Sequence, residues 1–169
     1  MRFIRNFRAA KLTGALLVAL SLAACASNPM GGGDQANGAY GRGQAAPGSA
    51  QDFVVNVGDR VFFESDSTEL SGQARATLDK QAQWLGRYNR YSFIVEGHAD
   101  ERGTREYNIA LGARRAQTVR DYLSARGISS ARIRTISYGK ERPVAVCNDI
   151  SCWSQNRRSV TVLSGGAGS

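Results

Sequence analysis

The residues best suited to bind a charged group are Asp100, Asn108 and Arg115, which lie close together in the sequence. At about 3.6 residues per helical turn, Asn108 and Arg115 share a stripe with apolar residues such as Leu111 and Leu123. A guanidinium on a stripe that faces the core needs an anionic partner or a wet cleft, because an unpaired buried charge is costly. The stripe therefore predicts either a structural ion pair at the domain edge or a cleft in which Arg115 forks onto a carboxylate.

Asp100 is the nearest candidate partner, because it lies on the polar segment that leads into this helix, four residues after Glu96. Glu96, His98 and Asp100 also alternate, so a strand continued through them would place them on one face, like a metal-binding triad. Gly97 and the polar residues around it favour a turn with self-capping acidic groups instead. We therefore expect no metal in this segment and keep the triad as the alternative.

Hydrophobic periodicity predicts the elements that position these residues. Helices are predicted over residues 71–88 and 105–126, and Gly127 provides the stop of the second. A polar loop is expected at 97–103 and a single helical turn at 129–132. Short strands are predicted at 53–57, 60–63, 91–96, 133–138 and 159–163. Helices that alternate with strands in so short a chain imply an α+β or α/β sandwich, in which helices pack on a single small mixed sheet.

The N-terminus has the layout of an export signal, in which a basic segment, Met1–Lys11, precedes an apolar run of eleven residues, Leu12–Leu22. That run is shorter than the roughly 20 residues that span a bilayer. Two alanines stand directly before Cys25, a pattern typical of bacterial lipoproteins that are cleaved and acylated at the cysteine. We therefore predict a lipoprotein signal peptide at 1–24 and lipidation of Cys25. Ordinary secretory cleavage beside an incidental cysteine is the alternative.

Three cysteines are present, and Cys147 and Cys152 enclose four residues. In an oxidising compartment such a pair predicts a small-loop disulfide. A zinc site would need two further ligands nearby, and the single histidine, His98, is far away in the sequence. We expect the disulfide to hold the loop before the last strand.

Glycine-rich sequence of low apolar content follows the signal segment. Residues 25–52 cannot bury enough apolar surface to fold, so a flexible tether is expected there, with a flexible tail at 164–169. A single domain of about 110 residues, 53–163, is left. The formal net charge of +8 falls to +4 without the four basic residues of the signal segment, with 18 basic and 14 acidic side chains. This weak excess argues against nucleic acid as a partner.

The chain resembles the peptidoglycan-associated lipoproteins, which carry an OmpA-like C-terminal domain, in three motifs: VEGHADERGTREYNIALGARRAQTVRDYLSARGI (95–128), ISYGKERP (136–143) and SQNRRSVTV (154–162). The resemblance covers residues 61–163 and implies an OmpA-like fold. The lipoprotein signal and the tether agree with it. The chain departs from the family at Ser65, where an apolar residue is frequent, and in the pair Cys147 and Cys152.

The resemblance implies non-covalent binding of peptidoglycan through the meso-diaminopimelate of the stem peptide, whose side chain ends in both an ammonium and a carboxylate. It places Asp100 at the ammonium and Arg115 at the carboxylate. Further residues expected at the ligand are Asp66, Asn108, Leu111 and Ala116. Those expected to support the pocket are Ser65, Asn156, Arg157 and Arg158.

The resemblance also implies where the domain works. Ala26, directly after the lipidated cysteine, points to the outer membrane, so the domain would face the periplasm and link that membrane to the cell wall. The implied protein partners are TolB and the other Tol proteins, in envelope integrity and in constriction at division. The alternative function is a metal-dependent cell-wall amidase that uses Glu96, His98 and Asp100. The favoured interpretation is a binding module without enzyme activity and without a cofactor.

Overall fold

The computed structural model describes residues 45–164. The predicted signal peptide, the lipidated Cys25, most of the predicted tether and all but the first residue of the predicted tail lie outside the described residues. None of the helices in the described part is long and apolar enough to cross a membrane.

Four strands form one mixed sheet in the order β1-β4-β2-β3. They are β1 (Arg60–Phe62), β2 (Ser92–His98), β3 (Ile133–Gly139) and β4 (Arg158–Ser164). β4 is antiparallel to both of its neighbours, whereas β2 and β3 are parallel and are joined through a helix. The last strand of the chain therefore lies inside the sheet, between two strands that precede it. The predicted single mixed sheet is confirmed.

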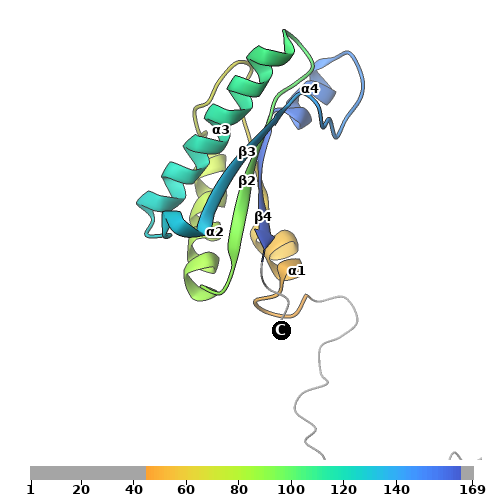
Figure 1. Ribbon diagram of the computed structural model, residues 1–169. Coiled ribbons are helices and arrows are strands. Elements are labelled where there is room, and N and C mark those ends of the chain that lie inside the picture. The colour runs from red at the N-terminus through yellow and green to blue at the C-terminus, as the bar shows by residue number, and fades with distance from the viewer. Residues whose placement is uncertain (1–44, 165–169) are drawn as a thin grey trace, which may run out of the picture. The chain divides into compact units, whose positions relative to one another are not determined.

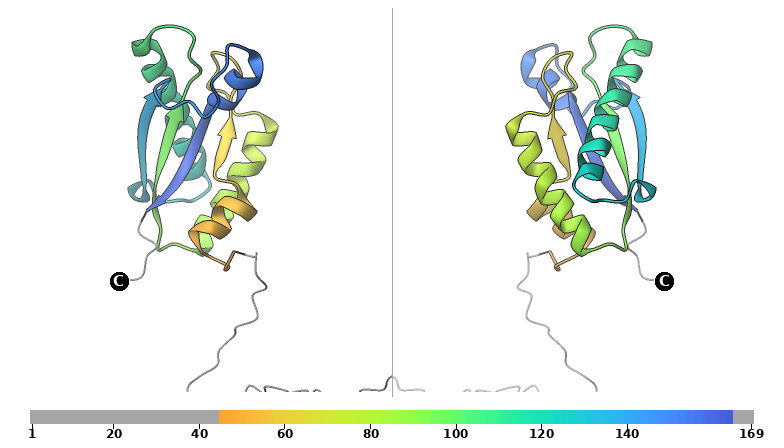
Figure 2. Two further views of the ribbon diagram at one scale, coloured as in Figure 1. Left: turned by 90° about the vertical axis from the view of Figure 1, so that its right-hand side faces the viewer. Right: turned by 90° about the vertical axis from the view of Figure 1, so that its left-hand side faces the viewer.

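Two long helices, α2 (Gly72–Arg87) and α3 (Arg105–Ala125), cover one face of the sheet (Figures 1 and 2). Each begins at a side-chain cap, because Ser71 and Thr104 accept a hydrogen bond from the main-chain N–H three residues later. Their apolar stripes join the inner side chains of the sheet in one core. Its members include Leu78, Leu85, Phe93, Val95, Val119 and Leu123. The predicted architecture of helices packed on a single sheet is confirmed.

α3 approaches β2 closely because two glycines meet there. A Cβ atom on Gly97 would lie 1.8 Å from the carbonyl oxygen of Gly112, so only glycine fits at this position. A bulge between Gly97 and His98 lies at the same level, where the pairing of β2 with β3 shifts register. The close contact brings Arg115 of α3 to the end of β2, where it bonds the main chain of His98.

Residues 53–57 are helical, so the predicted first strand is wrong. A short helix, α1 (Ala50–Asp52), continues into a π-helical turn, η1 (Phe53–Val57). The Trp84 indole N–H donates to Asp52 at 2.8 Å, and the rings of Phe53 and Trp84 lie 5.0 Å apart between centroids. These tertiary contacts outweigh the β propensity of a valine-rich stretch. The folded part therefore begins a few residues before 53, inside the predicted tether.

A further helix, α4 (Ile150–Asn156), lies in the segment that was predicted as a loop. Asp149 caps it, because its Oδ1 accepts a hydrogen bond from the N–H of Ser151 at 2.7 Å. The predicted disulfide between Cys147 and Cys152 is confirmed and joins the preceding loop to this helix. The predicted helical turn after α3 is the 3₁₀ turn η2 (Ser130–Arg132).

Thiol labelling of the exported, unreduced protein is expected to find neither Cys147 nor Cys152 free. Because the disulfide closes a loop of only a few residues, replacing both cysteines by serine should lower the free energy of unfolding by only about 1–2 kcal/mol. The single variant Cys147→Ser is the matched control, because it leaves Cys152 as a thiol that can be labelled after denaturation. Quantitative labelling of both cysteines in the native parent would contradict the bond.

Candidate functional site

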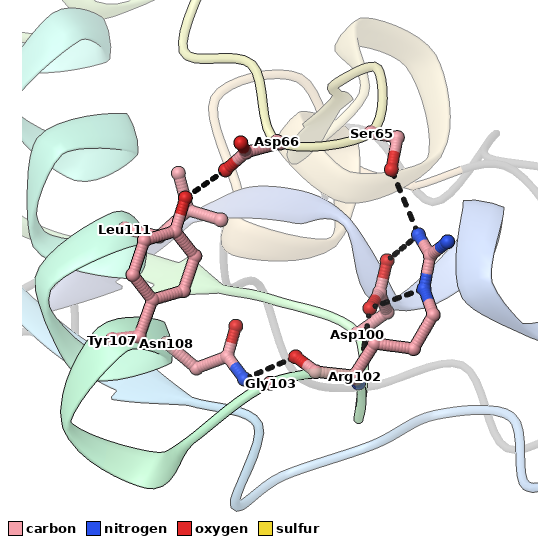
Figure 3. Close-up of a pocket in the computed structure, with 8 residues that line it drawn as sticks. All are labelled: Ser65, Asp66, Asp100, Arg102, Gly103, Tyr107, Asn108 and Leu111. Carbon is pink, nitrogen blue, oxygen red and sulfur yellow. Dashed lines mark hydrogen bonds and ion pairs between the residues drawn. The ribbon is translucent and has the colours of Figure 1, made fainter.

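Three segments that are distant in the sequence meet at one end of the sheet: the β1–α2 loop, the β2–α3 loop and α4 (Figure 1). The two loops and the start of α3 line an open pocket of about 250 Å³ (Figure 3). Its lining is largely polar and consists of Ser65, Asp66, Asp100, Arg102, Gly103, Tyr107, Asn108 and Leu111. Four of the six residues predicted at a ligand lie in this lining.

Asp100 lies on the β2–α3 loop, largely buried, and its carboxylate faces two arginines. Arg102 forks onto it, with 2.7 Å between Nη2 and Oδ2 and 3.1 Å between Nε and Oδ1. Nη1 of Arg157 lies 3.5 Å from Oδ2. Burial raises the pKa of Asp100, but the hydrogen bonds and charge of Arg102 outweigh burial and hold the pKa below its usual range. Asp100 is therefore a carboxylate at neutral pH.

Arg115, on α3, is fully buried and donates to three main-chain carbonyl groups. Nε bonds Ser67 at 2.9 Å, Nη1 bonds His98 at 2.9 Å and Nη2 bonds Glu64 at 3.0 Å. The guanidinium thus ties the β1–α2 loop to the end of β2. Among residues 45–164 no carboxylate forms a salt bridge with it, so the alternative of a structural ion pair is not formed.

The charge of Arg115 persists despite its burial. Burial lowers the pKa of Arg115 to about 10, and the nearby charge of Arg157 acts in the same direction. The carboxylates of Asp100 and Asp66 act in the opposite direction and favour the cation. Arg115 therefore stays a cation at neutral pH. A guanidinium also carries more N–H donors than the three that these carbonyl groups accept.

Asp66, on the β1–α2 loop, forms the rim opposite Asp100. Its φ of 54° lies in the left-handed region, which aspartate tolerates better than most residues. The Tyr107 hydroxyl, from the first turn of α3, donates to its carboxylate (Figure 3). That hydrogen bond, together with burial and the charge of Asp66, raises the pKa of Tyr107. The pair connects the two loops across one side of the pocket.

The remaining predicted ligand residues on α3 separate into two groups. Asn108 and Leu111 line the pocket, and the amide nitrogen of Asn108 donates to the carbonyl of Arg102 at 2.7 Å. Ala116 is fully buried in the hydrophobic core instead. One step along the helix turns it by about 100° from Arg115, which directs it away from the pocket. The structure therefore does not bring Ala116 to this site.

Residues 156–158, in the motif SQNRRSVTV, join the pocket to the rest of the sheet. Arg157, directly before β4, donates from Nε to the carbonyl of Phe63 at 3.0 Å and reaches Asp100 with Nη1. The side-chain oxygen of Asn156 accepts a hydrogen bond from the N–H of Ala145, and its side-chain nitrogen donates to the carbonyl of Ala145. Asn156 thereby shapes the loop before α4. Arg158 donates only to main-chain carbonyl groups. Arg157 thus contacts the site directly, whereas the other two hold the backbone.

The side chains of Glu96, His98 and Asp100 are not gathered into a metal site. The carboxylate of Asp100 pairs with Arg102 and Arg157. Burial lowers the pKa of His98 to about 4, with smaller contributions from the charges of Arg158 and Arg142. Its contact with Glu96 at 3.6 Å is therefore not an ion pair at neutral pH.

One set of potential metal ligands does converge within residues 45–164, and it consists of Cys147, Asp149 and Cys152. Its two sulfur atoms form the disulfide, so neither is available as a thiolate. The alternative of a metal-dependent amidase built on Glu96, His98 and Asp100 therefore has no support in the geometry.

Sequence reasoning missed three residues at the site: Arg102, Tyr107 and Trp153. Tyr107 could have been found, because it precedes Leu111 by four positions and helical spacing places the two side by side. The guanidinium of Arg102 lies over the Trp153 ring at 4.3 Å, and the Trp153 indole N–H donates to Glu101. No local pattern indicates that contact, because α4 meets the pocket only in the folded chain.

The sequence matches the OmpA family over residues 62–157, which include every residue of the pocket lining as well as Asn156 and Arg157. The chain belongs to the OmpA family. It is 65% identical over 155 residues to the peptidoglycan-associated lipoprotein of Rhizobium meliloti, covering 92% of this chain and 88% of that protein. The protein of the same name in Brucella melitensis is 57% identical over 168 residues, or 98% of both chains. Within the OmpA family, this chain belongs to the peptidoglycan-associated lipoproteins.

Solved structures agree with this assignment. The peptidoglycan-associated lipoprotein of Burkholderia pseudomallei is 42% identical, with a TM-score of 0.61 over 63% of this chain and 90% of that one. The C-terminal domain of Helicobacter pylori MotB superposes with a TM-score of 0.60, covering 64% of this chain and 86% of that one, at 22% identity. The second likeness concerns the fold alone.

Proposed function

We propose that this chain is an outer-membrane lipoprotein whose domain binds peptidoglycan non-covalently, through the diaminopimelate of the stem peptide. The similar proteins of Rhizobium meliloti and Brucella melitensis are named for peptidoglycan association and for lipidation. The observation that carries the proposal is an ionised, largely buried carboxylate, Asp100, in an open polar pocket beside the buried guanidinium of Arg115. A side chain that ends in an ammonium and a carboxylate needs this combination of charges.

The ammonium of the ligand would bind Asp100. Its carboxylate lines the pocket and is ionised at neutral pH, so a charge-assisted hydrogen bond can form there. Arg157 supports this contact, because its Nε is held by the carbonyl of Phe63 while its Nη1 faces Asp100. The carboxylate thus keeps its orientation when a ligand replaces part of its present hydrogen bonding.

The carboxylate of the ligand would be directed toward Arg115. That guanidinium is held in place by three carbonyl groups and stays charged, so it provides a fixed positive charge near the pocket residues Asp66 and Asp100. Arg115 is fully buried and lies outside the pocket lining, so a ligand carboxylate would have to reach its remaining N–H groups past the lining residues. Asp66 with Tyr107, Asn108 and Leu111 would form the walls around the rest of the side chain.

The domain would act at the junction of the outer membrane and the cell wall, tethered through acyl chains on Cys25. Binding to the wall would support envelope integrity and constriction at division. TolB and the other Tol proteins are the proposed protein partners, with TolB approaching the end of the sheet that holds the pocket. The family membership supports this assignment, since the relatives match this chain over nearly their full length.

Sedimentation of the full chain in detergent with purified sacculi tests the proposed function. The chain should pellet with sacculi, and free meso-diaminopimelate should release it in a concentration-dependent manner. Lysine is the matched competitor, because it carries the side-chain ammonium without the carboxylate, and it should compete much less. If the chain stays in the supernatant, or if lysine and diaminopimelate compete equally, the proposed site is wrong.

Changing Cys25 to serine should separate the chain from the outer membrane. Acylation requires sulfur at that position, and stable anchoring needs two or more acyl chains. Fractionation of cells should then find the variant as soluble or uncleaved material, whereas Cys147→Ser, which alters a cysteine of the folded domain, should stay with the membrane. Lipid-modified Cys25→Ser protein in the outer-membrane fraction would refute the predicted lipidation site.

A further inference from the structure

Arg102 hydrogen-bonds the carboxylate of Asp100, which the proposed function assigns to the ammonium of the ligand. Its Nε and Nη2 bond the two oxygens of Asp100 at 3.1 and 2.7 Å, and its main-chain N–H bonds Oδ1 at 3.2 Å. We propose that Arg102 is an internal competitor of the ligand: its guanidinium occupies the ammonium position at Asp100 and leaves it when peptidoglycan binds. This inference rests on the proposed function and concerns the control of the same pocket.

Three contacts hold the guanidinium across the pocket. Nη2 bonds Asp100 from one side and the hydroxyl of Ser65, on the β1–α2 loop, from the other at 2.8 Å. The Trp153 ring of α4 covers its face at 4.3 Å. Figure 3 shows the Arg102 side chain spanning from Asp100 to Ser65 beside the pocket. All three segments that meet at this end of the sheet therefore take part in holding one guanidinium.

The side chain of Arg102 can leave without moving the loop that carries it. It is 42% exposed, so its guanidinium remains solvated during the exchange and the ion pair is of the moderate strength typical of surface pairs. The main chain of Arg102 is anchored separately, because its carbonyl accepts from Asn108 and its N–H donates to Asp100. Displacement is therefore a rotamer change of one side chain.

The second arginine at Asp100 cannot play the same part. Arg157 is buried, at 4% exposed, and its Nε is bonded to the carbonyl of Phe63. Moving it would break that bond and disturb the start of β4, so Arg157 stays with the carboxylate in both states. Arg102 is the cation that a ligand ammonium can replace, because its side chain is exposed and its two hydrogen bonds occupy both oxygens of the Asp100 carboxylate.

Removing the competitor should strengthen binding. With the full chain in detergent and a soluble stem tripeptide that ends in meso-diaminopimelate, titration calorimetry should show Arg102→Ala binding about two- to fivefold more tightly than the parent. Ser65→Ala removes one of the three contacts and keeps every charge, so a smaller gain of about twofold is expected. A ligand contact made by Arg102 would give the opposite sign, and equal or weaker binding by Arg102→Ala overturns the proposal.

Two controls distinguish the two hydrogen bonds from Arg102 to Asp100 from a general effect of the positive charge. Arg105→Ala removes an exposed cation that pairs with Glu141 at 3.2 Å and not with Asp100, and it should leave the affinity unchanged. Arg102→Lys keeps the charge but cannot fork, so its affinity should lie between those of the parent and Arg102→Ala. If Arg102→Lys binds like the parent while Arg102→Ala binds more tightly, simple repulsion is the cause and the proposed fork is refuted.

The Nε–H resonance of Arg102 provides a direct readout that a merely structural role would not change. In the free protein its chemical shift should differ from that of a solvated arginine, because Nε bonds Asp100. Saturation with the stem tripeptide should move the shift to that of a solvated arginine, and an unchanged resonance would overturn the proposal. Failure of the proposed function looks different: the parent itself would then not bind sacculi or the tripeptide.

Discussion

Arg115→Ala is expected to lower the free energy of unfolding by about 3–5 kcal/mol, in addition to any effect on binding. The buried guanidinium donates to the carbonyl groups of Glu64, Ser67 and His98, and hydrogen bonds that involve a charged group contribute roughly 1.5–3 kcal/mol each. The alanine variant leaves these acceptors unsatisfied next to a cavity. Urea denaturation followed by circular dichroism measures the loss, which is a large part of the stability of a domain this size.

Arg115→Lys distinguishes charge from geometry. An ammonium keeps the positive charge but cannot serve three diverging carbonyl groups, so this variant should lie between the parent and Arg115→Ala in stability. Arg114→Ala, one position away and exposed, is the matched control and should unfold like the parent. A parent-like denaturation curve for Arg115→Ala would show that the three carbonyl contacts do not stabilise the pocket loops.

Asp100→Ala is expected to weaken binding to sacculi by roughly ten- to a hundredfold. The proposed contact with the ligand ammonium is a charge-assisted hydrogen bond, and its loss corresponds to about 1.5–3 kcal/mol. Asp100→Asn keeps the shape and loses the charge, so it should lose nearly as much. Quantitative sedimentation with sacculi at several protein concentrations measures both variants.

The thermal stability of both Asp100 variants must be followed in parallel, because each also removes the buried anion that lies 3.5 Å from Arg157. Melting curves will identify the temperature range in which Asp100→Asn is folded, and binding is compared there. Glu106→Gln is the matched control, because this exposed acid lies at the start of α3, six residues after Asp100, and outside the pocket lining. Parent-like sedimentation of folded Asp100→Asn would place the wall-binding site elsewhere on the domain.

The variants of Arg115 and of Asp100 also distinguish residues that position the pocket from residues that recognise the ligand. Arg115 fixes the distance between the β1–α2 loop and the end of β2, so its truncation should impair every function of the pocket. Asp100 lines the pocket itself, so its substitution should act mainly on ligands that carry an ammonium. A variant that loses binding without losing stability therefore identifies a ligand contact, whereas loss of both shows a supporting role and does not by itself exclude a contact with the ligand.

The sequence by itself determined α2, α3 and the strands from β1 onward to within about two residues, because hydrophobic periodicity is a local property. It also placed Arg115 on the buried stripe of α3 and indicated that such a charge needs partners. The motif resemblance identified the family. Residues 53–57 were misassigned, because a contact with Trp84 on a distant helix outweighs the local preference of a valine-rich stretch.

Only the tertiary structure decided which groups meet at the pocket. The partners of Arg115 are carbonyl oxygens up to 51 positions away, and a main-chain acceptor leaves no signature in the sequence. Arg157 reaches Asp100 because β4 inserts between β1 and β2, which brings it to Phe63, 94 positions earlier. The guanidinium of Arg102 is held by residues of three separate segments. Contacts of this kind depend on strand order and on the height of α3 on the sheet, which are set by packing of the whole chain and not by any local period.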